Sequence, residues 1–415
     1  MLDNQKVSRF ISAKRREKGL TQQQVASMLN VTFQAVSKWE NGSSFPNTEL
    51  LPDLADMLSV TVDDMLRGSE TTESAFTYSK AGVDVHYTDT LKSDMSKYIS
   101  TDHPRVLNGM GPFASLYDIK FDNIAHPVLV LKSEEPGSKQ KLAMEYGYAE
   151  SICHDMINHL VNDIVVMGAT PLAVLDTIVC GNAEKETIKS LIKGMSDACR
   201  ANECSLVGGE TSIQPGIVDN GTYILTSSIA GIVDRDDIID GSQISVGDTV
   251  LAVASNGLHT NGYSLVRLLM DEMPQIKNER IGGESFIEAI MKPHTAYYKA
   301  TKELATTRKV NGMAHITGGG IEGNLRRIIP DGLCARIDLS KIRTLPIFRH
   351  IKNNGNIADS EMLSTFNCGV GLNLVVAPEN VAFVTEHIRQ DFDCYPIGEI
   401  AAGAKKIAFA NNLIW

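Results

Sequence analysis

The stretch that decides the fold, residues 155–216, opens with DMINHLVNDIVVMGATPLAVLDTIVCGN and closes with CSLVGGETSIQPG. A helical pattern stops at Gly168-Ala169-Thr170-Pro171, and an apolar run follows. Later, Leu206-Val207 leads into Gly208-Gly209-Glu210, which we interpret as a strand that ends in two glycines and a carboxylate. Such segments, with acids and glycines at their ends, predict an α/β layer with a ligand site at the strand ends. Carboxylates there suit Mg²⁺, and free backbone N–H groups suit phosphate.

The composition is that of a globular protein of two or three domains, with 415 residues, 43% hydrophobic and 21% charged. No run of about eighteen apolar residues is present, so we expect no membrane span. The start, MLDNQKVSRF, lacks the apolar core of a signal peptide, which predicts a cytoplasmic protein. The seven cysteines predict reduced thiols, with Cys180 and Cys368 as small buried hydrophobes.

Charge is strongly polarised near the N-terminus, although the whole chain carries a net charge of −11. Residues 1–38 hold seven Lys and Arg against two Asp and Glu, whereas residues 39–68 hold one against six. The net charge argues against a protein that coats nucleic acid. It leaves room for one locally basic face.

Residues 5–67 predict a compact helical module. A first helix spans about Gln5 to Lys18, Thr21 caps a second with Gln24 as its capping-box partner, and Thr32 caps a third. The brief turn between the second and third helices predicts a helix-turn-helix. Its expected core residues are Val25, Ala26, Leu29, Val36 and Trp39.

The pattern of this module resembles the Cro/C1-type (XRE-like) DNA-binding domain. That resemblance places the third helix in the major groove of double-stranded DNA, with Gln34 able to read adenine. The implied DNA-contacting residues are Thr32, Gln34, Ala35, Ser37 and Lys38. The alternative is a helical docking or dimerisation module that does not bind DNA.

The rest of the chain predicts two α/β domains behind a short linker. We expect a small all-α helix-turn-helix domain at 1–68, a linker at 69–80, and α/β domains at 81–243 and 244–415. The fold class is therefore α/β, an α+β-type two-domain fold with an N-terminal helical head. We interpret GVGLNLVVA (369–377) as the closing strand.

Residues 78–409 resemble aminoimidazole ribonucleotide synthase, also called phosphoribosylformylglycinamidine cyclo-ligase. The resemblance is carried by AGVD (81–84), VNDIVVMGATPL (161–172), LVGGETSIQPG (206–216), SNGLHTNGYSLVR (255–267), MAHITGGGIEGN (313–324) and TFNCGVGL (365–372). It implies ATP-dependent closure of formylglycinamidine ribonucleotide to aminoimidazole ribonucleotide, with Mg²⁺ on the nucleotide. It also implies a homodimer formed through the first α/β domains.

The resemblance also implies roles for individual residues. His259 is the expected proton carrier, with Asn261 as an orienting amide. The implied Mg²⁺ ligands are Glu134, Asp155 and Glu210, and the implied nucleotide contacts are Asp155, Asp163, Gly208, Gly209, Glu210, Thr317, Gly318, Gly319 and Gly320. We expect Glu210, His259 and the glycine turn 318–320 to share one cleft.

Each assignment has a structural alternative. Asp155 could lie on a solvated helix face, Asp163 could cap a helix, and His259 could be a structural loop residue. The glycines 318–320 precede a helix and so present N–H groups for phosphate, but they could form a plain tight turn. His315 could simply be a packed core residue, and Thr365, Phe366 and Asn367 could be substrate-side or structural.

Two loops depart from the family pattern. SEEPGSK (133–139) stands where the family reads TDGVGTK, and NGMGPFASL (108–116) stands where it reads GGLGGFGAL. His86 also replaces an aspartate. Two hypotheses follow: a working cyclo-ligase with a DNA-binding head, or a transcriptional regulator whose synthase-like part senses a purine intermediate or nucleotide without turnover.

Overall fold

The computed structural model describes residues 3–69, 90–91, 93–99, 103–108 and 113–415. The chain divides into two compact units, residues 1–81 and 82–415. Most of the predicted linker, the AGVD motif, His86 and part of the 108–116 loop lie outside the described residues.

The first unit is the predicted helix-turn-helix domain. Its helices are α1 (Asn4–Glu17), α2 (Gln22–Met28), α3 (Phe33–Glu40), α4 (Leu51–Leu58) and α5 (Val62–Arg67), with the 3₁₀ turn η1 (Thr48–Leu50). Thr21 and Gln24 form the predicted capping box, and the Thr32 hydroxyl accepts a bond from the N–H of Ala35. The five predicted core residues are all buried. The predicted helices, caps and core of this module are confirmed.

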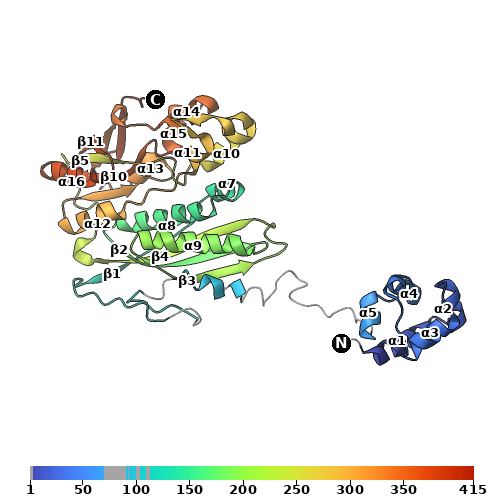
Figure 1. Cartoon of the computed structure of the whole chain (residues 1–415). Helices are drawn as coiled ribbons and strands as arrows, with labels where there is room; N and C mark the ends of the chain where they lie inside the picture. Colours follow the sequence, from blue (N-terminus) through green and yellow to red (C-terminus); the bar gives the residue numbers. More distant parts are fainter. Residues whose placement is uncertain (1–2, 70–89, 92, 100–102, 109–112) are drawn as a thin grey trace. The chain divides into compact units, whose positions relative to one another are not determined.

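A four-stranded sheet with helices on one face forms the N-terminal half of the second unit (Figure 1). Its strands, in the order β1-β4-β2-β3, are β1 (Pro127–Glu134), β4 (Tyr223–Asp234), β2 (Thr170–Cys180) and β3 (Ser205–Ile213). Only β2 and β3 run parallel, because α9 (Lys185–Ala201) connects them. Helices α7 (Lys139–Glu145) and α8 (Ala149–Val165) complete the helical layer. The predicted end of β3 at Glu210 is wrong, since the strand continues to Ile213.

Alternation along β1 separates the two faces of this sheet. Leu129 and Leu131 are exposed, while Lys132 and Glu134 point to the opposite face, toward α8. Leu175 of β2 and Ile224 of β4 are also exposed. The face without helices therefore carries apolar side chains.

A six-stranded sheet forms the C-terminal half, in the order β12-β9-β11-β5-β10-β8. Its strands are β5 (Thr249–Ala254), β8 (Gly312–His315), β9 (Leu333–Asp338), β10 (Val370–Val376), β11 (Cys394–Ala402) and β12 (Ile407–Ala410). Its main helices are α10 (Tyr263–Glu272), α11 (Phe286–Met291), α12 (Tyr298–Thr307), α13 (Gly320–Leu325), α14 (Pro346–Gly355), α15 (Asp359–Thr365) and α16 (Val381–Ile388). The closing-strand prediction is wrong: β10 is an inner strand, and β11 and β12 follow it.

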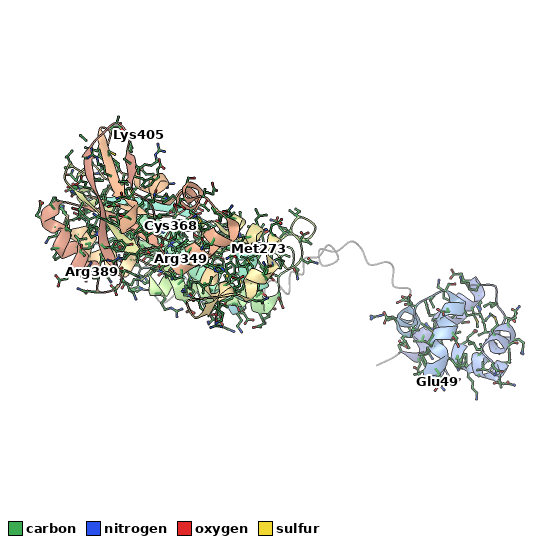
Figure 2. All side chains as sticks on the ribbon, turned by 90° about the horizontal axis from the view of Figure 1, so that it is seen from above. Glu49, Met273, Arg349, Cys368, Arg389 and Lys405 are labelled. Atoms are coloured by element: carbon green, nitrogen blue, oxygen red, sulfur yellow. The ribbon has the colours of Figure 1, made fainter. Side chains whose placement is uncertain are left out.

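The two halves share one hydrophobic core. Within the described ranges, no helix has the length and apolarity needed to cross a membrane. All seven cysteines are buried and unpaired, among them Cys180 and Cys368, the latter labelled in Figure 2. The expectation of small, buried thiols is met.

Candidate functional site

The polar face of α8 builds the centre of the site. Asp155, Asn158, His159, Asn162 and Asp163 recur at helical spacing, so they lie on one side of the helix, toward the C-terminal half. The Asn158 amide donates to the carbonyl of His294, 2.7 Å away, and the Asn162 amide donates to the carbonyl of Thr295 at 2.8 Å. These bonds fix the two halves against each other.

Asp155 is fully buried and forms an ion pair with a buried lysine. Its Oδ1 lies 2.8 Å from Nζ of Lys139 and also accepts the N–H of His294. The ammonium of Lys139 donates as well to the carbonyls of His259 and Lys292. Burial raises the pKa of Asp155 to about 6 even though Lys139 opposes that shift. The solvated alternative for Asp155 is wrong, and sequence reasoning missed Lys139.

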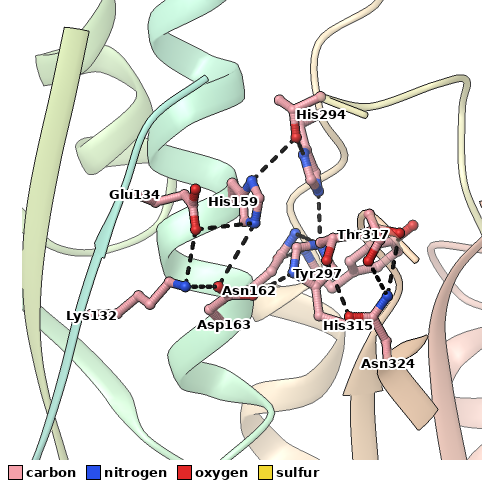
Figure 3. Close-up of polar contacts among 12 residues, drawn as sticks. Lys132, Glu134, His159, Asn162, Asp163, His294, Tyr297, His315, Thr317 and Asn324 are labelled. Atoms are coloured by element: carbon pink, nitrogen blue, oxygen red, sulfur yellow. Dashed lines mark hydrogen bonds and ion pairs between the residues drawn. The ribbon is translucent and has the colours of Figure 1, made fainter. Parts of the chain in front are cut away.

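Asp163 is the hub of a second network (Figure 3). Its carboxylate accepts from Nδ1 of His315 at 2.7 Å and pairs with Lys132 at 3.0 Å. Lys132 also pairs with Glu134 at 2.9 Å. Burial alone would raise the pKa of Asp163, but the bond from His315 and the nearby cations lower it overall. Asp163 lies within α8 and orients the imidazole of His315, so it does not cap the helix.

Four imidazoles gather beside Asp163. His294 and His315 approach to 2.8 Å between their Nε2 atoms, and the Thr260 hydroxyl lies 3.4 Å from Nδ1 of His294 and 3.2 Å from Nδ1 of His159. Burial, followed by the neighbouring His315, lowers the pKa of His159 to about 4. The helical spacing of His159 from Asp155 and Asp163 was the one sequence signal for its place here. Thr260 lies inside the quoted motif 255–267 but was given no role, and His294 lies outside every quoted motif.

His259 is buried in the same cluster. Its ring stacks on His294 with centroids 4.0 Å apart, and its Nε2 lies 3.1 Å from the Thr295 hydroxyl. Burial lowers the pKa of His259 well below its ordinary value, so the ring is neutral at physiological pH. Its backbone has a φ of +61°, a conformation that few non-glycine residues adopt.

The glycine turn lies next to Asn261. A Cβ at Gly318 would come within 3.2 Å of Oδ1 of Asn261, so the two predicted groups are neighbours. Gly319 and Gly320 have φ values of +91° and +59°, and a Cβ at Gly320 would collide with the carbonyl of Leu363. Thr317 bonds Asn324 in the short α13. Gly319 and Gly320 are therefore required by the packing and backbone conformation of the turn, whether or not the turn binds phosphate.

Asn367 also has a structural reason for its place. Its side chain bonds the Ser255 hydroxyl and the carbonyl of Gly257. Phe366 is buried against Gly262, where a Cβ would meet its ring. These two residues hold the 255–262 loop in position. The Thr365 hydroxyl instead bonds Glu361 in the preceding turn of α15.

Glu210 lies on the other face of the N-terminal sheet. It pairs in register with Thr177 and lines a cavity of about 650 Å³ together with Leu131, Leu175 and Gly208. Gly209 is required there because a Cβ would lie 2.1 Å from Oδ1 of the buried Asp176. Burial, followed by the charge of Glu210, raises the pKa of Asp176 to about 7.

The expected single cleft is therefore not what the chain builds. The Glu210 cavity includes neither His259 nor the glycine turn, and Gly319 lines a separate cavity with Glu322 and Arg326. Likewise, Glu134 lies beside Asp163 and His159 rather than beside Asp155 and Glu210. The physical reason is the sheet itself, because β3 presents Glu210 on the face opposite to the helical layer that holds the histidines.

The predicted DNA-contacting residues share the surface of α3. Thr32, Gln34 and Lys38 are exposed, and Ala35 and Ser37 are half-buried. Val36 and Trp39, on the opposite side of the helix, are buried in the core of the unit. The helix can thus present this set to a partner without unfolding.

The fold and the site together define a protein with a helix-turn-helix unit and a second unit of two α/β halves, with buried polar residues where these halves meet. The family models that match are AIR synthase related protein, N-terminal domain, at residues 127–233, its C-terminal domain at 245–411, and Helix-turn-helix at 11–65. A phosphoribosylformylglycinamidine cyclo-ligase from Methylobacillus flagellatus is 40% identical over 75% of this chain and 90% of its own length. One from Desulfitobacterium hafniense is 36% identical over 80% and 99%.

The chain belongs to the phosphoribosylformylglycinamidine cyclo-ligase family and carries a helix-turn-helix domain at its N-terminus. Among solved structures, E. coli HypE matches with a TM-score of 0.58 at 16% identity, covering 78% of this chain and 94% of its own. The thiamine-monophosphate kinase from Stenotrophomonas maltophilia K279a matches with a TM-score of 0.56 at 16% identity, covering 80% and 98%. These two likenesses show the shared fold.

Proposed function

We propose that the protein catalyses the ATP-dependent cyclisation of formylglycinamidine ribonucleotide to aminoimidazole ribonucleotide, with Mg²⁺ on the nucleotide. The observation that carries the proposal is the 40% identity to a cyclo-ligase over most of both chains. ATP transfers its terminal phosphoryl group to the formamide oxygen, the amidine nitrogen attacks that carbon, and phosphate leaves. Mg²⁺ would neutralise the phosphates of ATP, and Glu210 is the oxygen donor proposed for it. Asp155 and Glu134 lie on the other face of the sheet, so they cannot share that ion with Glu210.

The residues of the chain supply the other requirements of this reaction. The attacking nitrogen loses a proton, and a neutral buried imidazole such as His259 can accept one. Asn261 and the glycine turn beside it offer amide groups to oxygens that gain charge. Asp163 would act indirectly, since its bond to His315 fixes that ring at the edge of the cluster.

Two protomers would pair through the open face of the N-terminal sheet. Leu129, Leu131 and Leu175 are 53%, 71% and 49% exposed on that face, an apolar surface of the kind that interfaces cover. Glu210 shares a cavity with Leu131 and Leu175 that residues 113–115 and 117 of the same chain also line, and the proposed partner would cover it. A charge placed there by Leu131→Lys should yield monomers in light scattering, while the same change at exposed Ile217 should not.

The test of catalysis is an assay of the purified full-length protein with formylglycinamidine ribonucleotide, ATP and Mg²⁺, which follows both ADP and aminoimidazole ribonucleotide. We expect Glu210→Gln to lower kcat/KM by at least about 100-fold, since it removes a charge at the nucleotide. The matched control is Glu379→Gln on the exposed η5 turn (Pro378–Asn380), which should change nothing. ATP binding without any product in the wild type would refute the proposal.

The second candidate is a regulator that binds ligand without turnover. The observation that favours it is the altered loop 133–139, where SEEPGSK stands in place of the family's TDGVGTK. Under this hypothesis the product is absent, and purine intermediates or nucleotides change the affinity for operator DNA. DNA affinity that ignores these ligands would count against it.

We also propose that α3 binds double-stranded DNA. The polarised charge of the unit and the exposed Gln34 and Lys38 support this. Lys38→Ala should weaken binding to all sequences and reduce the salt slope by about one, whereas Gln34→Ala should relax sequence preference. Glu49→Gln, on the η1 turn, is the control. No binding to a selected pool of duplexes at low salt would refute DNA recognition and leave the docking alternative.

A further inference from the structure

Four buried imidazoles converge where the two halves of the second unit meet. His159 comes from α8, His259 from the loop after β5, His294 from the segment before α12, and His315 from the end of β8. Their exposed fractions are 7%, 1%, 1% and 5%. Ring centroids of His294 lie 4.0 Å from His259 and 4.9 Å from His315. Burying this many polar rings is costly unless bonds or a ligand satisfy them.

Hydrogen bonds fix which ring nitrogens carry lone pairs. The carboxylate of Asp163 accepts from Nδ1 of His315, so in the neutral ring Nε2 carries the lone pair, which the Asn162 amide faces at 3.5 Å. Nε2 of His294 faces that lone pair at 2.8 Å. His259 bonds the Thr295 hydroxyl only through Nε2. Within the part of the chain that the structure describes, Nδ1 of His259 is fully buried without a hydrogen-bond partner.

We propose that His259, His294 and His315 bind a divalent transition-metal ion of the Zn²⁺ class. One ligand atom from each of these buried residues lies within 4.8 Å of the others. Three imidazoles are a ligand set that Zn²⁺ and Co²⁺ favour and Mg²⁺ does not. Asp163 behind His315 is the carboxylate partner that metal-bound histidines commonly have. This site is distinct from the oxygen donor proposed above for Mg²⁺.

The cluster must rearrange to take the ion, because the ring of His259 is stacked on His294 at an interplanar angle of 20° and must turn its Nδ1 toward the shared ion. Two nitrogens on one tetrahedral Zn²⁺ are about 3.4 Å apart, so the 2.8 Å pair must widen by about 0.6 Å. His294 must move its proton from Nε2 to Nδ1, where the Thr260 oxygen can accept it, so no proton needs to leave the site. The neighbouring Asp163 and Glu134 carry two negative charges against one from Lys132, which favours a cation.

The bound ion would occupy the unpartnered nitrogen of His259, the residue proposed as the proton acceptor. Metal-loaded protein should therefore turn over more slowly, which makes the cluster an inhibitory site if the cyclase proposal holds. Metal binding itself does not depend on that proposal. Its test consequently reads binding rather than activity.

The experiment uses full-length protein without a polyhistidine tag, stripped with chelator and titrated with Co²⁺ in excess Mg²⁺. We expect one equivalent of Co²⁺ to bind with a visible absorption band typical of nitrogen ligands, and Zn²⁺ to displace it. His294→Gln should lower the affinity at least about 10-fold, and Asp163→Asn, which removes the carboxylate behind a ligand, about 10- to 100-fold. The matched control is His387→Gln, a half-buried residue of α16, and this variant should bind Co²⁺ with the affinity of the wild type.

Circular dichroism and thermal melts establish that each variant is folded. A saturable band in wild type and His387→Gln that is lost in folded His294→Gln supports the site. No saturable band in folded wild type overturns the proposal. A band of equal affinity in His294→Gln and wild type also overturns it, because the ion is then held elsewhere.

Discussion

Acid should destabilise this protein through its buried neutral imidazoles, and His159 allows the effect to be measured residue by residue. Burial lowers its pKa from an ordinary 6.5 to about 4. Between these values the unfolded chain binds a proton at this site and the native protein does not. The free energy of unfolding therefore rises with pH through this window and falls as the solution is acidified.

The magnitude follows from the size of the shift. One proton taken up only by the unfolded state changes the free energy of unfolding by about 1.4 kcal/mol per pH unit. From pH 6.5 to about 5, His159 should thus cost the native state about 2 kcal/mol, and about 3 kcal/mol by pH 4. The raised pKa values of Asp155 and Asp176 act with the opposite sign, but they are present in wild type and variant alike.

The assay compares wild type with His159→Met by urea unfolding at several pH values. The chain has two tryptophans, so a Trp39→Phe background leaves Trp415 as the fluorescent reporter of the second unit. The substitution carries a constant cost from the lost Thr260 bond, and the difference between the two proteins should shift in favour of the variant as pH falls. His387→Gln measures the effect of losing a histidine elsewhere. A difference that stays constant from pH 7 to about 5 would refute the claim that His159 is held neutral.

Three further outcomes are expected. Lys139→Met should destabilise the second unit by about 3–5 kcal/mol, because it leaves Asp155 buried and unpaired, and Lys139→Met with Asp155→Leu should recover much of the loss in urea titrations. Gly320→Ala should prevent stable folding, since its Cβ would overlap the Leu363 carbonyl, whereas Gly221→Ala at a similar positive φ has open space and should cost about 1 kcal/mol in thermal melts. Glu40→Ala should destabilise only the helix-turn-helix unit, because it removes the carboxylate that accepts from Arg15, Ser12 and Gln22. We expect a loss of about 2 kcal/mol in its free energy of unfolding, measured as a lower melting temperature by Trp39 fluorescence.

The fold was largely predictable because its signals are local. The starts of α2 and α3 could be predicted from the capping side chains Thr21, Gln24 and Thr32, and the structure confirms each cap. The helical patterns of α8 and α9 and the apolar runs of β1 to β4 are likewise written in short stretches. The end of β3 was misjudged because Gly208 and Gly209 suggest a break. Their real constraint is the approach of Asp176 from the neighbouring strand, which lies 33 residues earlier than Gly209 in the sequence.

The site was only partly predictable because its chemistry depends on which face each residue takes. Motif positions identified Asp155, Asp163, His259 and the glycine turn, and the structure places the first three within one polar network. They could not reveal that Lys139 reaches into the interior to pair with Asp155, since a lysine is rarely fully buried and is ordinarily expected at the surface. Nor could they separate Glu210 from the histidines, because the alternation of β3 decides that, and its register was unknown.

The location of Glu210 also constrains how the enzyme could work. Within one chain, its carboxylate and the imidazole cluster lie on opposite faces of the four-stranded sheet, so they cannot both contact one small substrate through that sheet. The open face is apolar and would be covered by a second protomer, which would bring its own residues to the Glu210 cavity. If the protein is a cyclo-ligase, its nucleotide site therefore requires the dimer, and a monomeric Leu131→Lys variant should lose turnover while keeping the histidine network intact. A fully active monomer would show that the Glu210 cavity works without the partner protomer.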